Sequence, residues 1–184
     1  RALLDIEDAL SANAAFDPAV AATAFMLVGS DYFSSLLMPG LAARAFAEAP
    51  SVTLQMIDHP PASLFGLLAD GKADLGVDRA VDVPEWILRQ KLFRSHLACV
   101  ARAGHPALAA RGIRPGGVID AETFCALPHV LRSADGGRTG TIDPALGKLG
   151  LVRQVAMTVP HFHAVALTVS GSDLIGSLPV DFAT

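Results

Sequence analysis

The chain has 184 residues, with 18 acidic and 14 basic side chains and a formal net charge of −4 at pH 7. Hydrophobic residues make up 52% and charged residues 17%, which excludes an intrinsically disordered chain and predicts an aliphatic core. The negative charge argues against a protein that neutralises many phosphates of DNA or RNA by itself. The longest nearly continuous apolar run, residues 19–28, is about half the roughly 20 residues of a membrane-spanning helix, so no membrane partner is expected.

Two cysteines, Cys99 and Cys125, are too few for a disulfide framework, and we expect two free, buried thiols. This cysteine usage favours a reducing compartment, so we expect a cytoplasmic protein. The sequence begins at Arg1 without an initiator methionine and without the three regions of a signal peptide. We therefore expect the chain to be a piece of a longer protein.

An amphipathic helix is predicted at the start of the chain. Leu3, Ile6 and Leu10 have the three-and-four spacing of one helix face, and Pro18 disfavours helix at the residue before it. The sequence leaves two interpretations of this helix open, the end of a coiled coil or a surface helix of its own domain.

Residues 24–77 alternate short strands with helices. The apolar run 24–29 is typical of a strand covered on both faces, and Ser30 and Asp31 offer capping oxygens to a helix that reaches about Ala49. Further strands are predicted at 52–57 and 73–77, with a helix at 61–69 between them. Strand, helix, strand, helix, strand is the pattern of parallel crossovers.

After residue 77 the pattern becomes less regular. A turn-rich stretch at 105–117 and a glycine-rich loop at 135–140 separate the predicted elements. The predicted strands are 92–93, 97–100, 130–131, 155–159 and 173–178, and the predicted helices are 121–127, 143–149 and 161–169.

Several segments carry a family resemblance through their order and spacing. They are Phe25-Met26-Leu27-Val28-Gly29-Ser30-Asp31-Tyr32, Leu37-Met38-Pro39-Gly40-Leu41, residues 68–77, Gly104-His105-Pro106-Ala107-Leu108, residues 149–153 and residues 172–179. Together they resemble the effector-binding domain of LysR-type transcriptional regulators. Residues 127–130 followed by 159–162 are similar to the branch with the nodulation regulators and the regulators of naphthalene and nitroaromatic breakdown.

The resemblance implies an α/β protein with two Rossmann-like lobes joined by crossover strands, the type 2 periplasmic-binding-protein fold. It implies that residues 1–15 are the end of a linker helix. Residues 16–94 with 161–184 would form lobe I, and 95–160 lobe II. The strand and helix that usually follow Leu178-Pro179 in this family would be missing from lobe I.

The resemblance also implies partners. A small-molecule effector, aromatic or a carboxylate, would bind between the lobes, and the domain would form a homodimer or homotetramer. DNA would be bound only through an N-terminal winged helix-turn-helix that this chain lacks. The lobes would change orientation on binding, which would pass a signal to that domain.

Eight residues are candidates for effector binding. Ser30, Asp31, Tyr32 and Phe33 form the turn from the first strand into the first long helix, where a ligand of an open α/β sheet binds. A helix cap with packing aromatics is the alternative interpretation of that turn. The resemblance adds Asp78, which could equally be a polar turn residue, and His129, His161 and Phe162. Without the resemblance, a lone histidine among apolar neighbours is more often a hydrogen-bonded core residue.

No catalytic residues, cofactor or metal are expected. His161 and His163 would point about 200° apart on a helix, and no cysteine or acidic residue stands at ligand spacing. The glycine-rich loop lacks the lysine of a phosphate-binding loop, and no nucleophile elbow is present. A periplasmic solute-binding protein and an enzyme on the same scaffold remain as alternatives, distinguished by an export signal and by turnover.

Overall fold

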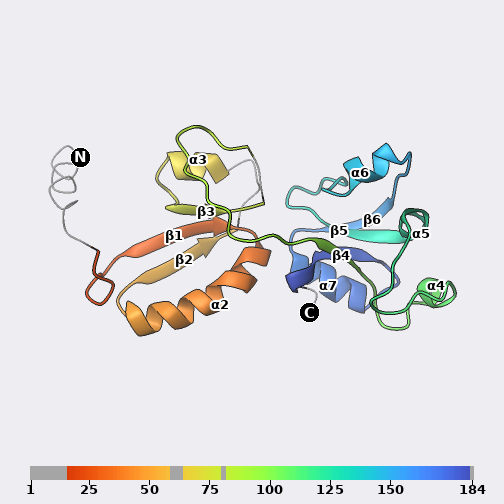
Figure 1. Ribbon diagram of the computed structural model, residues 1–184, viewed down its shortest axis with the longest axis horizontal. Helices are drawn as coiled ribbons and strands as arrows, with labels where there is room; N and C mark the ends of the chain where they lie inside the picture. The colour runs from red at the N-terminus through yellow and green to blue at the C-terminus, as the bar shows by residue number, and fades with distance from the viewer. Residues whose placement is uncertain (1–15, 59–63, 80–81, 183–184) are drawn as a thin grey trace.

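Three parallel strands form the sheet of the first lobe (Figure 1). They are β1 (Ala24–Gly29), β2 (Thr53–Ile57) and β3 (Leu75–Val77), in the order β2-β1-β3. Helix α2 (Asp31–Glu48) connects β1 to β2, and α3 (Leu64–Ala69) precedes β3. The computed structural model describes residues 16–58, 64–79 and 82–182, so the predicted linker helix at 1–15 lies outside the described residues.

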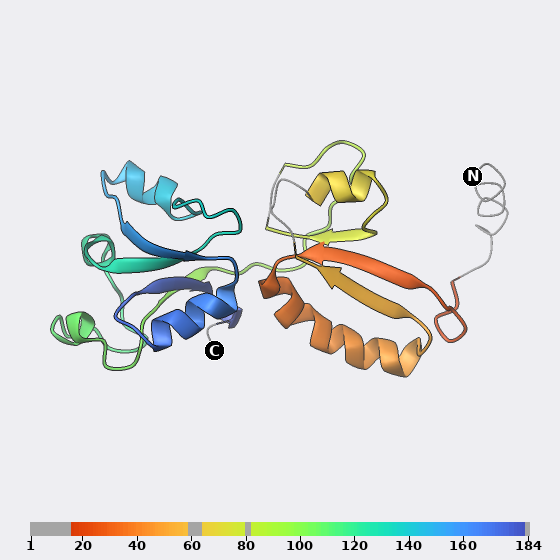
Figure 2. The same cartoon turned by 180° about the vertical axis from the view of Figure 1, so that it is seen from behind.

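The core of this lobe lies between the sheet and α3. Val28, Leu64 and Ala73 are buried there, with Met26 and Phe65 packed against them. Helix α2 covers the other face of the sheet (Figures 1 and 2). Its outer side is exposed, because Phe46 has 85% of its surface accessible and Tyr32 is its single buried residue.

The second lobe is built on two strand pairs. β4 (Leu97–Val100) and β7 (Gly176–Pro179) are antiparallel, whereas β5 (Pro128–Arg132) and β6 (Gln154–Val159) are parallel. The Val130 amide donates to the Ile175 carbonyl at 2.9 Å, and the Ile175 amide donates to the Pro128 carbonyl at 3.0 Å. These bonds join the pairs in the order β6-β5-β7-β4.

Helices cover both faces of this second sheet. The shorter ones are α4 (Pro106–Ala109), α5 (Ala121–Ala126), α6 (Asp143–Lys148) and the 3-10 turn η2 (Val180–Phe182). One buried cluster holds Phe124 of α5 and Leu146 of α6, and the other holds Val165 and Val169 of α7 (Phe162–Ser170).

The prediction that residues 161–184 complete the first lobe is wrong for the part that the structure describes. Strand β7 pairs with β4 of the second lobe, and α7 packs on β5 and β7. The physical reason is burial, because Val165 and Val169 of α7 pack against Val130 and Leu178 of the second sheet. Residues 82–96 then form the connection between the lobes (Figure 1).

The remaining predictions of elements are mostly confirmed. The predicted strand at 92–93 is wrong, because these residues form no strand in the structure. Each other predicted strand and helix within the described residues has a counterpart whose ends differ by up to three residues. Both cysteines are free, as expected, but Cys99 is exposed and Cys125 is only partly buried, so the prediction of two buried thiols is wrong. In the described part of the chain, no helix combines the length and apolar character needed to cross a bilayer.

Candidate functional site

A cavity of about 700 Å³ lies between the two lobes. The first lobe contributes the ends of β1 and β3 and the start of α2. The second lobe contributes the start of β4, the end of β5, the loop before α6, the residue before β6 and parts of α7 and β7. The lining residues are Gly29, Ser30, Tyr32, Phe33, Val77, Asp78, Arg79, Ser95, His96, Leu97, Leu131, Arg132, Ala134, Asp135, Thr139, Gly140, Thr141, Ile142, Arg153, Phe162, Ser177 and Pro179.

The turn from β1 into α2 gives the cavity a helix N-terminus. Ser30 is the N-cap residue with extended backbone, and its side chain makes no capping hydrogen bond. The expectation that this hydroxyl caps the helix is therefore wrong, and the hydroxyl instead stands at the cavity wall. Unpaired amides in the first turn of an 18-residue helix attract anions, so this wall suits a carboxylate.

Aromatic rings line the contact between the lobes. Tyr32 of α2 lies 4.9 Å from Phe33 and 6.3 Å from Phe162 of the second lobe, measured between ring centroids. The Tyr32 hydroxyl donates to Asp181 Oδ2 at 3.1 Å, and Ser95 donates to the same oxygen at 2.5 Å. Burial raises the pKa of Tyr32, which keeps the phenol protonated as a donor. The cavity therefore has an apolar wall with polar groups at its edge.

Arginine side chains from the second lobe supply positive charge. Arg132 donates to the Pro160 carbonyl at 2.9 Å, and its guanidinium carbon lies 5.6 Å from the centre of the Phe162 ring. Arg153 is held by two hydrogen bonds to Asp143, both of 2.8 Å. The Arg153 guanidinium holds the pKa of the Asp143 carboxyl below its usual value, so this pair is ionised at neutral pH.

Five of the eight predicted site residues line this cavity: Ser30, Tyr32, Phe33, Asp78 and Phe162. They come from both lobes, so segments far apart in the sequence meet there. Whether they bind an effector stays a prediction.

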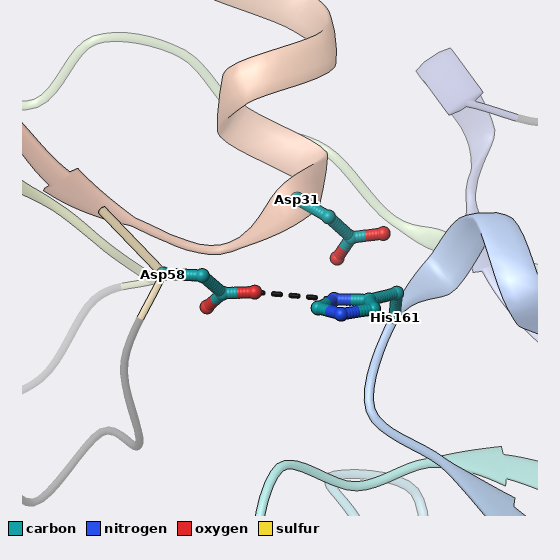
Figure 3. Close-up of side chains that lie close together, drawn as sticks. All are labelled: Asp31, Asp58 and His161. Atoms are coloured by element: carbon teal, nitrogen blue, oxygen red, sulfur yellow. Dashed lines mark ion pairs between the residues drawn. The ribbon is translucent and has the colours of Figure 1, made fainter. Parts of the chain in front are cut away.

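Asp31 and His161 lie outside the cavity lining. Asp31 Oδ2 accepts a hydrogen bond from the His163 amide at 3.1 Å, and His161 Nδ1 lies 3.2 Å from Asp58 Oδ2. Asp31, Asp58 and His161 form a separate cluster at the contact between the lobes (Figure 3).

The prediction that His129 points into the cleft is wrong. His129 is fully buried in the second lobe, with its Nε2 atom 2.8 Å from the Phe124 carbonyl oxygen. Burial also lowers the pKa of His129, as for a neutral histidine packed in a core. The physical reason is that helices cover both faces of the second sheet. His129 packs on Phe124 of α5, with the ring centroids 4.4 Å apart, whereas Val130 packs on the other face in the cluster with Val165 of α7.

Sequence reasoning missed several lining residues of the second lobe. Arg132 and Ala134 stand at the carboxyl end of β5, and Thr139 and Thr141 follow in the loop that leads to α6. The rule that pointed to Ser30, that ligands bind beyond the carboxyl ends of strands, could have found them as well. For Arg153, at the start of β6, the sequence offers no comparable signal.

The family model for the LysR substrate binding domain matches residues 22–184. The chain belongs to this family. The predicted family and its type 2 periplasmic-binding-protein fold are thereby confirmed.

Individual relatives agree with the family. The HTH-type transcriptional activator NahR of Pseudomonas putida is 27% identical over 178 residues, which cover 97% of this chain and 57% of NahR. Nodulation protein D 2 of Bradyrhizobium diazoefficiens is 27% identical over 180 residues, covering 97% of this chain and 52% of that protein. The crystal structure of the probable transcriptional regulator PA0477 from Pseudomonas aeruginosa has a TM-score of 0.79 at 29% identity, covering 97% of this chain and 57% of that one.

The relatives also bear on the alternatives. The predicted branch with the nodulation regulators is confirmed by these similarities. NahR is a transcriptional activator and PA0477 a probable transcriptional regulator, so a periplasmic solute-binding protein is not favoured. The chain spans a little over half the length of the curated relatives it matches.

Proposed function

We propose that this chain is the effector-sensing part of a LysR-type transcriptional regulator, and that a small molecule binds in the cavity between the lobes. The observation that carries the proposal is that both lobes line one cavity while residues 82–96 connect them. A ligand that touches both walls favours one orientation of the lobes over others. Such a preference shifts a population of conformations, and no bond has to be broken.

The lining supports an aromatic or carboxylate effector. Arg79, Arg132 and Arg153 are the fixed positive charges on the cavity wall, and Asp78 and Asp135 are the negative ones. The amides at the start of α2 add to the positive side. The Phe33 and Phe162 rings offer an apolar surface on which a flat ligand can stack.

The rest of the regulator enters the proposal through the family. DNA is bound by a winged helix-turn-helix outside this chain, in the cytoplasm, and the chain itself has no enzymatic role. Two or four copies assemble, with α2 of one copy against the second lobe of another. A partner on α2 is supported by its exposed apolar residues, Leu36, Leu41 and Phe46. Burying such apolar surface against another subunit is favourable.

The test is a thermal-shift screen with aromatic and aliphatic carboxylic acids, including benzoate and succinate, followed by calorimetry on the best acid. Ser30→Ala is expected to weaken binding by about 1 to 3 kcal/mol, since it removes a hydrogen-bonding group from the wall. Ser51→Ala, which changes an exposed serine in the same lobe, serves as the matched control. Equal affinities for wild type and Ser30→Ala contradict the assigned site, and a screen without any stabilising acid contradicts the ligand class.

A further inference from the structure

Three side chains with metal-binding atoms meet where the lobes touch, outside the cavity. Asp31 is the first residue of α2, Asp58 follows the end of β2, and His161 is the N-cap residue of α7 (Figure 3). One ligand atom of each lies within 4.8 Å of the other two. The two carboxylates belong to the first lobe and the imidazole to the second, so the cluster bridges both.

The spacing within the cluster fits one coordination shell. His161 Nδ1 lies 3.2 Å from Asp58 Oδ2. Nitrogen and oxygen ligands about 2.1 Å from a zinc ion are roughly 3.4 Å apart at the tetrahedral angle and roughly 3.0 Å apart at a right angle. These two atoms are therefore already placed as neighbouring ligands, and a ligand atom of Asp31 lies within 4.8 Å of both.

A second observation concerns Asp31 alone. Its Oδ1 atom is buried and has no hydrogen-bond partner among the described residues, whereas Oδ2 accepts from the His163 amide. A buried carboxylate oxygen without a partner destabilises the protein, because it loses its hydrogen bonds to water and makes none within the protein. This orphaned oxygen needs a proton donor or a cation.

The charges in the cluster favour a cation. Asp31 and Asp58 can carry two negative charges, and within residues 16–58, 64–79 and 82–182 no lysine or arginine forms an ion pair with either. His161 supplies at most one positive charge. Mixed nitrogen and oxygen donors suit zinc and similar divalent transition metals, whereas magnesium and calcium prefer oxygen alone.

We propose that Asp31, Asp58 and His161 bind one divalent transition-metal ion such as Zn²⁺. This ion links the two lobes, because its ligands come from both. Three protein ligands leave a further position for water. The neighbours Ser30 and Tyr32 of Asp31, and Phe162 of His161, line the effector cavity. Because the ion holds the same lobe contact that shapes the cavity, metal binding and effector binding are coupled, and each strengthens the other equally.

The experiment titrates the metal-free chain, without a histidine tag, with zinc chloride in a calorimeter, and with cobalt chloride while recording visible absorption. One equivalent of zinc is expected to bind. His161→Gln and Asp58→Asn are each expected to weaken binding by about tenfold or more, because each removes a ligand. His163→Gln is the matched control, since it changes an exposed histidine on the same helix whose side chain is outside the cluster. Magnesium chloride in excess should not displace the zinc.

Three outcomes overturn the proposal: no saturable binding of zinc or cobalt, the same affinity in either cluster variant as in wild type, or a loss in His163→Gln as large as in His161→Gln. Circular dichroism of each variant shows that it is folded, which is expected because Asp58 and His161 are exposed. The titration contains no organic acid, so a failure to bind metal does not contradict the proposed effector function. Likewise, a thermal-shift screen without a stabilising acid does not contradict the metal site.

Discussion

The ion pair between Arg153 and Asp143 fixes one wall of the cavity. The Arg153 side chain is 2% exposed and that of Asp143 is 21% exposed. Asp143 also accepts a short hydrogen bond from the Gly140 amide, in the loop that lines the cavity. Both oxygens of the carboxylate are therefore occupied, and the guanidinium is held in one position where a ligand could meet it.

Asp143→Asn should destabilise the fold by about 3 kcal/mol, because it leaves the buried Arg153 without its countercharge. The matched control is Asp70→Asn, which removes the exposed pair with Lys72 and should cost less than about 1 kcal/mol. Urea unfolding of both variants measures the difference. Similar losses in the two variants would contradict the role of burial.

The pH dependence of the same variant has a defined sign. The pKa of Asp143 in the folded protein lies below its ordinary value of 3.8, chiefly through the Arg153 hydrogen bonds. Its contribution to stability is therefore present above about pH 4 and disappears as the pH falls through the folded value. The gap in melting temperature between wild type and Asp143→Asn should narrow below about pH 4, and a gap that widens there would contradict the assignment.

At the scale of elements, the close approach of β1 to its neighbours positions the turn at Ser30. A Cβ atom on Gly29, the last residue of β1, would lie 2.9 Å from the Val77 carbonyl oxygen of β3 and 2.8 Å from the Met56 methyl of β2. The flexible methionine can move, but the β3 backbone cannot move without disturbing the sheet. Only glycine therefore fits at this edge of the cavity.

Gly29→Ala should destabilise the fold by about 1 to 3 kcal/mol, through the strain of an overpacked contact. Gly66→Ala is the matched control. Gly66 lies on α3 with nothing within 4 Å of an added Cβ, so alanine should be neutral or stabilising by up to about 1 kcal/mol. Thermal unfolding compares the two, and an equal response would remove the steric argument.

Local elements could be predicted from the sequence because their signals are local. The apolar run 24–29 and the alternation at 52–57 correspond to β1 and β2, and Pro50 follows shortly after the end of α2. The place of β7 could not be predicted, since its pairing with β4 joins residues about 80 positions apart. The burial of His129 depends on α5 covering its face of the sheet, and the residues around His129 do not reveal which face a helix covers.

The residues of the candidate site also divide into those with a local sequence signal and those that depend on contacts between the lobes. Ser30, Tyr32 and Phe33 followed from the rule for strand ends in open sheets, which depends on a single strand-to-helix turn. Asp58 became visible as the partner of His161 only when the two lobes were placed together. Contacts across the lobes depend on the orientation of whole sheets, which no local pattern encodes.

For the molecule as a whole, the lobes are linked by residues 82–96 and touch through few side chains. The hydrogen bond from Tyr32 to Asp181 and the ion pair of His161 with Asp58 cross this contact and are both partly open to solvent. Exposed pairs of this kind contribute about 1 kcal/mol or less each, so the orientation of the lobes can respond to a ligand. We propose that this response is how the protein senses its effector.

Hydrogen–deuterium exchange, with and without the carboxylic acid that stabilises the chain most in the thermal screen, measures this response in each lobe separately. We expect slower exchange in both walls of the cavity at once, in residues 29–33 of the first lobe and 131–142 of the second. The exposed end of α2 should keep its exchange rate and serves as the internal reference. Protection confined to one lobe, or located away from both walls, would contradict a ligand held between them.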